Sequence, residues 1–243
     1  MGSNFARGRL TDLPSIQRAI DRRMPISLIL VREGPRSDAV SAVAERARAA
    51  GVAISIESER EMRRMSETGD APELLAVTGP PPTHDLATLM AAEGLVLILI
   101  GLRYPGNIGF ILRSAEVAGA AGVVVANDWA GSEWQEAQRV GMRAQRFLSV
   151  LEVGAGDAIA AARSAGRRLV AVETSGSTLP WEVDLSKSTA LMMGGETKGI
   201  SGDFLAQADE VVRIPTRGFI PSYNVQAATG MLLGEWLRQT RDA

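Results

Sequence analysis

Six short apolar runs in the second half of the chain limit what it can fold into. They lack the alternation of polar and apolar residues that marks a half-solvated strand, so both faces of each strand are expected to be buried. Helical segments separate the first four runs, which predicts crossover connections in a parallel α/β sheet. The expected strands are 95–101, 122–126, 147–151, 168–173, 189–193 and 210–214, and the expected helices are 107–119, 133–144, 156–165 and 222–240.

The first part of the chain predicts a smaller α/β module, which a proline-rich stretch at 79–85 interrupts. We therefore expect one domain at 1–82, a linker at 83–92 and a second domain at 93–243. In the first domain, helices are expected at 14–23, 37–50 and 59–67, and strands at 27–31, 52–58 and 73–79.

The residue composition excludes several kinds of chemistry. The chain has no Cys, which excludes disulfides, thiol catalysis and thiolate zinc sites. The single His, His84, lies beside three prolines and is expected to be a solvated linker residue, so neither a metal site nor a catalytic triad is expected. The apolar run at 94–102 is too short to cross a bilayer, and the N-terminus lacks the apolar core of a signal peptide. A cytoplasmic protein with no membrane contact is the expectation.

Charge is distributed unevenly along the chain. The net charge of −2 argues against strong unspecific binding of nucleic acid. Residues 1–32 nevertheless carry six Arg against two Asp. Arg offers a planar fork that suits phosphate, which would fit a segment facing RNA. A general compositional bias toward Arg explains the same excess, and both interpretations stay open.

The run at 189–193 ends in Gly194, Gly195 and Glu196. Open α/β sheets bind ligands at the carboxyl ends of their strands. Two adjacent glycines let the backbone approach a ligand closely. A simple strand-to-helix turn with a solvated Glu is the alternative.

The run at 210–214 leads into a loop stiffened by Pro215 and Pro221. Ser222 and Asn224 follow at a helix start, so two polar side chains lie near a second strand end. The alternative is that Ser222 is only the N-cap and Asn224 a first-turn residue with no further role.

A third segment follows the strand expected at 95–101. It carries Asn107 and, six residues later, Arg113 within an apolar stretch. An Arg there must either extend to solvent or meet an anion. The alternative is an ordinary surface Arg beside Glu116.

In this order and spacing, the three segments resemble the motifs of the SpoU/TrmH family of SPOUT-class RNA methyltransferases. Its first motif, Asn followed by Arg, is matched by Asn107 and Arg113, and its second, Gly-x-Glu-x-x-Gly, by Gly194, Glu196 and Gly199. The resemblance covers roughly residues 94–240. The N-terminal module is similar to the ribosomal-protein-like RNA-binding domain that often precedes this catalytic domain. The third motif is matched by Ile214, Pro215, Ser222, Asn224, Val225 and Ala228.

The resemblance implies a fold and an activity. The fold would be a parallel-sheet SPOUT domain with a deep trefoil knot, preceded by a small three-layer α/β domain. The protein would be a homodimer that binds S-adenosylmethionine and no metal. It would transfer a methyl group to a ribose 2′-hydroxyl of ribosomal or transfer RNA.

The resemblance also implies roles for individual residues. Arg113, reaching across the dimer, would orient the hydroxyl and stabilise charge, because a guanidinium is a poor base at neutral pH. The other catalytic residues would be Asn107, Glu196, Ser222 and Asn224. The cofactor would be bound by Thr174, Gly194, Gly195, Glu196, Gly199, Ile214, Ser222, Tyr223, Asn224 and Ala227.

Two residues depart from the family pattern. Tyr104 stands where the family often has Asp, and Tyr223 stands where Leu is usual. Tyr223 is expected either to be buried or to stack on a base or on the cofactor. Two further functions stay open: an RNA-binding protein of the same fold without catalysis, and a methyltransferase that acts on a nucleobase.

Overall fold

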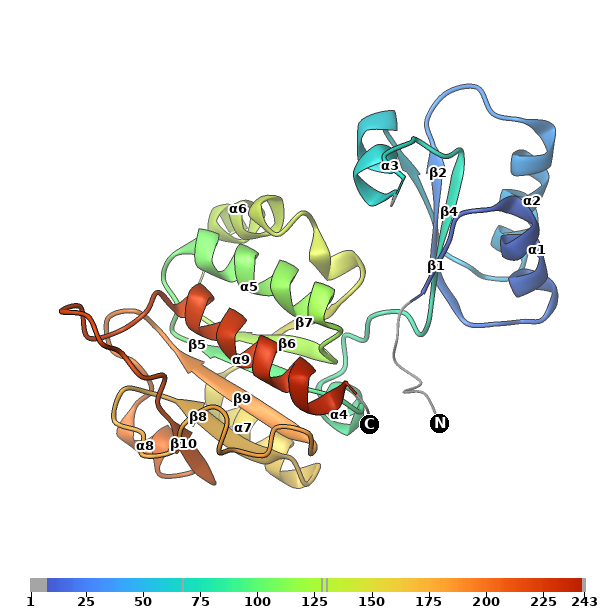
Figure 1. Ribbon diagram of the computed structural model, residues 1–243. Coiled ribbons are helices and arrows are strands. Elements are labelled where there is room, and N and C mark those ends of the chain that lie inside the picture. The colour runs from blue at the N-terminus through green and yellow to red at the C-terminus, as the bar shows by residue number, and fades with distance from the viewer. Residues whose placement is uncertain (1–7, 67, 128, 130, 242–243) are drawn as a thin grey trace. The chain divides into compact units, whose positions relative to one another are not determined.

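The structure, a computed structural model, describes residues 8–66, 68–127, 129 and 131–241 (Figure 1). The chain forms two compact units, and the division falls between Pro81 and Pro82. Each unit has its own sheet and its own apolar core.

The N-terminal unit is built on a mixed four-stranded sheet of order β1-β4-β2-β3. β2 and β3 are parallel, whereas β4 runs antiparallel to β1 and β2. The elements are β1 (Arg9–Leu10), α1 (Leu13–Asp21), β2 (Ile26–Arg32), α2 (Asp38–Ala49), β3 (Ile54–Glu57), α3 (Glu59–Met65) and β4 (Leu74–Thr78).

Alternation along β2 separates the two faces of this sheet. Ile29 and Val31 are buried in the core that α1 and α2 cover, whereas Leu30 packs with Met62 of α3 on the other face. The expected three-layer arrangement is therefore confirmed. Side chains of Asp12, Ser37 and Ser58 accept backbone N–H bonds at the starts of the three helices, which fixes where each helix begins.

The C-terminal unit contains the predicted parallel sheet, with six strands in the order β10-β8-β9-β5-β6-β7. The strands are β5 (Val96–Ile100), β6 (Gly122–Ala126), β7 (Ser149–Glu152), β8 (Arg168–Val172), β9 (Thr189–Gly194) and β10 (Glu210–Val212). The helices are α4 (Leu86–Ala91), α5 (Pro105–Ala118), α6 (Gly131–Val140), α7 (Ala155–Ser164), α8 (Gly202–Leu205) and α9 (Val225–Thr240), with a short 3-10 helix at Ala144–Arg146.

Helices cover both faces of this sheet, as the unalternating strands predicted. Leu97 and Leu99 of β5 face the core formed with α5 and α9. Val96 and Ile98 face the core formed with α4 and α7. In Figure 1, α5 and α9 lie side by side on one face and α7 lies on the other. The trefoil knot, a matter of how the chain is threaded, stays a prediction.

The segment expected to be a linker differs from the prediction. Residues 83–92 contain α4, whose Leu89 and Met90 are fully buried and which packs on α7. Only the stretch before α4 is free of regular structure, and there the Thr83 N–H donates to Ser149 Oγ at 3.0 Å. His84 is exposed, as expected.

The end of α4 is held by a buried cation, Arg167. Arg167 is 3% exposed, and its guanidinium donates to the carbonyl oxygens of Met90, Ala92, Gly94 and Thr189. Burial lowers the pKa of Arg167 to about 10, so it remains protonated at neutral pH. The guanidinium therefore satisfies carbonyls that the end of a short helix leaves without donors.

Two helix boundaries also differ from the prediction. The helix expected to reach residue 144 ends at Val140, because Met142 and Arg143 have left-handed φ values of 53° and 57°. The last helix begins at Val225, and its N-cap is Asn224, whose Oδ1 accepts the Gln226 N–H at 2.9 Å. The alternative in which Ser222 is the N-cap is therefore wrong.

Candidate active site at the carboxyl edge of the parallel sheet

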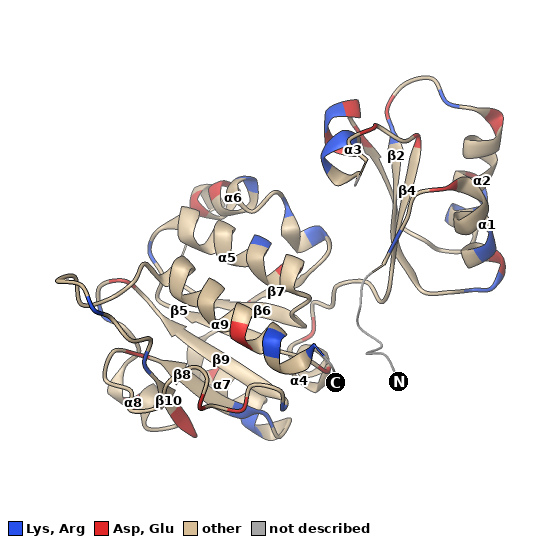
Figure 2. Cartoon of the chain, viewed as in Figure 1, with Lys and Arg blue, Asp and Glu red and all other residues tan. Residues whose placement is uncertain are grey.

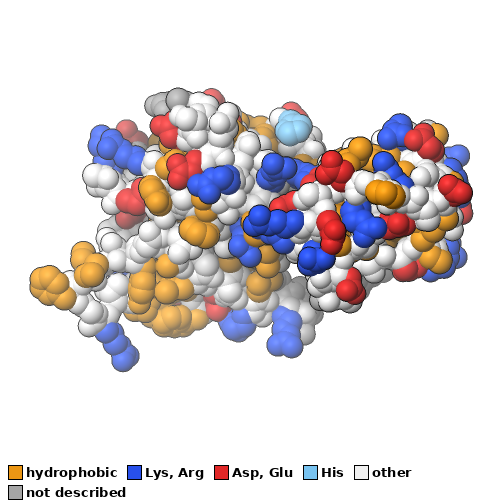
Figure 3. All heavy atoms as spheres, turned by 90° about the horizontal axis from the view of Figure 1, so that it is seen from above, with side chains coloured by type: hydrophobic (Ala, Val, Ile, Leu, Met, Phe, Trp, Pro, Cys, Tyr) orange, Lys and Arg blue, Asp and Glu red, His pale blue; other side chains and the backbone are white. Residues whose placement is uncertain are grey.

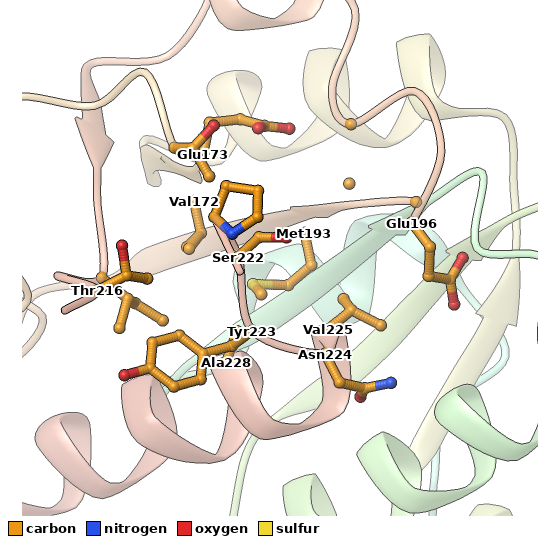
Figure 4. Close-up of a pocket in the computed structure, with 16 residues that line it drawn as sticks. Val172, Glu173, Met193, Glu196, Thr216, Ser222, Tyr223, Asn224, Val225 and Ala228 are labelled. Carbon is orange, nitrogen blue, oxygen red and sulfur yellow. The ribbon is translucent and has the colours of Figure 1, made fainter. Parts of the chain in front are cut away.

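A pocket of about 500 Å³ lies where β8, β9 and β10 end (Figure 4). Its volume is within the range of about 300–1,000 Å³ that small-molecule sites occupy. The loop after β9 forms one wall, and the segment from Ile214 to the start of α9 forms the other. The structure therefore brings together the two strand ends that the sequence singled out.

Most of the predicted cofactor residues line this pocket. They are Thr174, Gly194, Gly195, Glu196, Gly199, Ile214, Ser222, Tyr223 and Asn224. Ala227 does not line it, and its neighbour Ala228 does, since successive helical residues face different directions. Of the predicted catalytic residues, Asn107 and Arg113 lie outside the lining.

Three predicted residues from separate segments form one hydrogen-bonded cluster. Asn107 Nδ2 donates to Glu196 Oε1 at 2.5 Å, and Asn224 Nδ2 donates to Asn107 Oδ1 at 3.2 Å. The Arg103 backbone N–H donates to the other Glu196 oxygen at 3.2 Å. Asn107 is only 6% exposed, so it lies behind the pocket lining in contact with both Glu196 and Asn224.

Gly194, Gly195 and Gly199 lie where other parts of the chain pass too close to leave room for a Cβ atom. A Cβ on Gly194 would collide with the backbone at Gly199 and Ile200, and one on Gly195 would collide with Gly101. A Cβ on Gly199, at φ +60°, would strike the Glu173 carboxylate. The glycines thus allow the loop after β9 to pass close to the end of β5, and this close passage forms the pocket wall.

Arg113 is exposed and has no hydrogen bond or ion pair with another described residue. It lies six residues beyond Asn107, or roughly 9 Å along α5. It shares one helical face with Phe110 and Val117, which are 48% and 76% exposed. Within one chain, Arg113 therefore points outward with two exposed apolar neighbours and not into the pocket.

The two tyrosines that depart from the family pattern are both exposed. Tyr104 is the N-cap of α5 without a side-chain hydrogen bond, and its ring lies against Gly106. Tyr223 is 44% exposed, lines the pocket and donates its hydroxyl to Pro215 O at 3.4 Å. The interpretation of Tyr223 as a buried aromatic residue is therefore wrong.

Several lining residues were not predicted from the sequence. Glu173 and Thr216 add polar groups, and Val172 and Met193 add apolar ones. Glu173 directly follows β8, so its position at the carboxyl edge of the sheet was the available signal. Apolar side chains, backbone groups and carboxylates together suit an aromatic nucleoside that carries a positive charge, which is the chemistry of S-adenosylmethionine.

Residues 8–66, 68–127, 129 and 131–241 contain neither a metal site nor a membrane-spanning helix. No group of three or more His, Asp or Glu side chains there could hold a metal ion. None of the helices in these ranges is long and apolar enough to cross a membrane.

Known proteins with similar sequences are RNA methyltransferases. The chain is 30% identical over 188 residues to the 23S rRNA (adenosine(1067)-2'-O)-methyltransferase of Streptomyces laurentii, a match that covers 75% of this chain and 68% of that protein. It is 34% identical over 167 residues to the 23S rRNA (guanosine-2'-O-)-methyltransferase RlmB of a Burkholderia species, covering 67% of this chain and 68% of the relative.

Solved structures with a similar fold include two with bound AdoMet. An rRNA methyltransferase from Sinorhizobium meliloti matches with a TM-score of 0.61 and 25% identity, over 96% of this chain and 87% of that one. The SpoU methyltransferase AviRb from Streptomyces viridochromogenes matches with a TM-score of 0.58 and 25% identity, over 98% and 91%. These likenesses confirm the predicted α/β fold class. Residues 94–234 match the model of the SpoU rRNA Methylase family, and the chain belongs to that family.

Proposed function

We propose that this protein transfers a methyl group from S-adenosylmethionine to a ribose 2′-hydroxyl of large-subunit ribosomal RNA. The observation that carries the proposal is the Asn107–Glu196–Asn224 cluster, in which Asn107 hydrogen-bonds one residue from each of the two pocket walls. The names of the relatives, which are 23S rRNA 2'-O-methyltransferases, support the ribosomal substrate. Action on ribosomal RNA fits a cytoplasmic enzyme.

The pocket residues divide into two groups by what they can bind. Val172, Met193 and Ile214 offer an apolar bed for the adenine ring, and the backbone of the loop after β9 offers hydrogen-bonding groups. Ser222 and Asn224 line the same pocket from the segment that leads into α9 (Figure 4). S-adenosylmethionine, when bound, supplies an electrophilic methyl group on a sulfonium.

The chain's own contribution to the reaction is alignment and proton handling. A ribose hydroxyl is a poor acid, so its oxygen must be held in line and its proton removed. Alignment supplies much of the rate, and proton removal contributes typically 10²–10⁴-fold. Arg113 orients the hydroxyl and stabilises the developing negative charge, and the adjacent RNA phosphate takes the proton, because a guanidinium cannot accept one at neutral pH.

A second chain completes the site in this proposal. Arg113 lies on an exposed face of α5 together with Phe110 and Val117, and the adjacent α9 exposes Met231. The loop between β10 and α9 also presents apolar side chains at its tip (Figure 3). In this loop, Phe219 is fully exposed. A homodimer that covers this face would bury these side chains and bring Arg113 to the partner's pocket.

The N-terminal unit binds the RNA in this proposal. Arg22 and Arg23 of its Arg-rich segment are exposed at the end of α1. Arg18 and Arg32 instead donate hydrogen bonds within the unit, and Arg7 lies outside the described residues. Charges of both signs are interspersed on α2 and α3 (Figure 2), so contact with phosphate is expected to be local and salt-sensitive.

The test is a methylation assay in vitro on ribosomal RNA from cells that lack this gene. The purified protein and S-adenosylmethionine should make one nucleotide resistant to alkaline cleavage, because a methylated 2′-oxygen cannot attack the phosphate. Methylation that leaves alkaline cleavage intact would instead show a nucleobase methyltransferase. Tight RNA binding without any methyl transfer would show the inactive RNA-binding protein.

A further inference from the structure

Glu173 is a carboxylate on the pocket wall that has no part in the Asn107–Glu196–Asn224 cluster. It follows β8 directly, and its Oε1 accepts the backbone N–H of Ile200 at 2.6 Å. No other hydrogen bond or ion pair to its side chain is found among the described residues. One carboxylate oxygen is therefore held by the loop after β9, and the other has no donor among the described residues. Glu173 lines the pocket (Figure 4).

The charged residues that line the pocket are all of one sign. Two acids, Glu173 and Glu196, line it, and none of the described lining residues is Lys or Arg. Glu196 is already bound through both oxygens, by Asn107 Nδ2 and by the Arg103 backbone N–H. Glu173 has one carboxylate oxygen without a donor among the described residues, so it is the lining acid more open to a positive ligand.

Methyl transfer changes the charge of the bound cofactor by one unit. S-adenosylmethionine has a positive sulfonium sulfur, whereas its demethylated product has a neutral thioether at the same place. The ammonium and carboxylate groups are the same in both molecules. A fixed negative charge on the pocket wall can therefore distinguish substrate from product, although the two have nearly the same shape.

We propose that Glu173 selects the charged cofactor over its demethylated product and so limits product inhibition. This inference rests on the proposed function. At an effective dielectric constant of about 20, a unit charge on the wall of a pocket and a unit charge bound inside it interact by roughly 1–2 kcal/mol, which corresponds to an affinity difference of about tenfold. Glu173 is a specificity-determining residue in this account and takes no part in the transfer step.

The substitution that isolates the charge is Glu173→Gln. The amide oxygen of Gln can still accept the Ile200 N–H, and the side chain keeps its length, so only the charge is removed. Glu152→Gln is the matched control, because Glu152 is exposed at the end of β7 and lies outside the pocket lining. Both variants change the net charge of the protein equally.

Calorimetry on the 243-residue protein measures Kd for S-adenosylmethionine and for the demethylated product. In Glu173→Gln, we expect affinity for S-adenosylmethionine to fall about tenfold and affinity for the product to stay within about twofold. Glu152→Gln should match the wild type for both ligands. The wild-type ratio of the two Kd values should also approach one as salt concentration rises.

Two results would overturn the inference alone. An equal loss of affinity for both ligands in Glu173→Gln would mean that Glu173 only supports the loop at Ile200. Unchanged affinity for both ligands would mean that Glu173 has no role in cofactor binding. A wild-type protein that binds neither ligand at millimolar concentration would instead overturn the proposed function and this inference with it.

Discussion

At the scale of single residues, the site depends on one buried amide. Asn107 donates to Glu196 and accepts from Asn224, so only a side chain with both a donor and an acceptor fits between them. Asn107 and Arg113 belong to the same predicted motif, yet the structure separates their roles. Asn107 is buried in the site of its own chain, whereas Arg113 is exposed on α5.

Asn107→Asp tests this hydrogen-bond geometry. The introduced carboxylate would lie against Glu196 Oε1, and two carboxylates sharing a site raise the pKa of one of them. A raised folded-state pKa contributes stability at low pH, and this contribution is lost as pH rises. The variant should therefore be less stable than wild type by about 1–3 kcal/mol at pH 7 and should recover toward pH 4.

Urea unfolding at several pH values measures this difference. Gln135→Glu is the control, because it adds the same charge at an exposed position of α6. A stability deficit of Asn107→Asp that does not change with pH would contradict the arrangement of the two side chains.

At the scale of elements, the buried strands could be predicted well from their apolar runs. Elements whose position depends on contacts with distant parts of the chain could not. The six strands of the parallel sheet lie close to their predicted positions, because a fully buried strand needs an uninterrupted apolar run. α4 was missed, because its two turns follow a proline-rich stretch and are stabilised by contacts with α7 and Arg167 from far along the chain. The early end of α6 depends on two left-handed residues that are not glycines, Met142 and Arg143.

Arg167→Met tests the anchoring of α4. The substitution keeps an unbranched apolar stem but removes the donor from four carbonyl oxygens, two of them in buried and two in partly buried hydrogen bonds. We expect the free energy of unfolding to fall by about 3 kcal/mol or more, since each unsatisfied buried group costs about 1–3 kcal/mol. Chemical denaturation measures this loss. Arg163→Met, at an exposed position of α7, should cost much less, and equal effects of the two substitutions would contradict the anchoring role.

Tyr104→Asp tests the start of α5. Tyr104 is an N-cap without a side-chain acceptor, and Asp at an N-cap can accept a backbone N–H of the first turn. The Asp variant should be more stable than Tyr104→Ala by about 1 kcal/mol. Thermal unfolding of both variants provides the comparison. A Tm for the Asp variant at or below that of the Ala variant would show that the first turn is held in another way.

At the scale of the whole molecule, the described chain carries a nearly complete cofactor pocket and an Arg that does not reach it. The family and the fold class were predictable from the sequence, because three ordered motifs fall on strand ends and helix starts. The orientation of Arg113 could not be predicted, because helical periodicity alone does not decide which face of α5 is covered. The proposed dimer accounts for both its exposure and its apolar neighbours.

Mixing two inactive variants tests whether a second chain completes the site. Arg113→Ala should fold and bind cofactor, but its rate of methyl transfer should fall at least about 100-fold. The second variant, Asn224→Ala, removes a residue of the pocket. Randomly mixed dimers should recover roughly a quarter of wild-type activity, because half of them contain both variants and each such dimer has one complete site. Mixing Arg113→Ala with Arg113→Gln is the control and should recover none. Full activity of Arg113→Ala alone, or no recovery in dimeric mixtures, would contradict the shared site.

The most direct test of the central claim is a ribose-methylation map of ribosomal RNA at nucleotide resolution, from cells with and without this gene. We predict one 2′-O-methylated nucleotide in the large-subunit RNA that disappears when the gene is deleted. It should return with the wild-type gene and fail to return with Arg113→Ala. Identical maps with and without the gene would contradict the account.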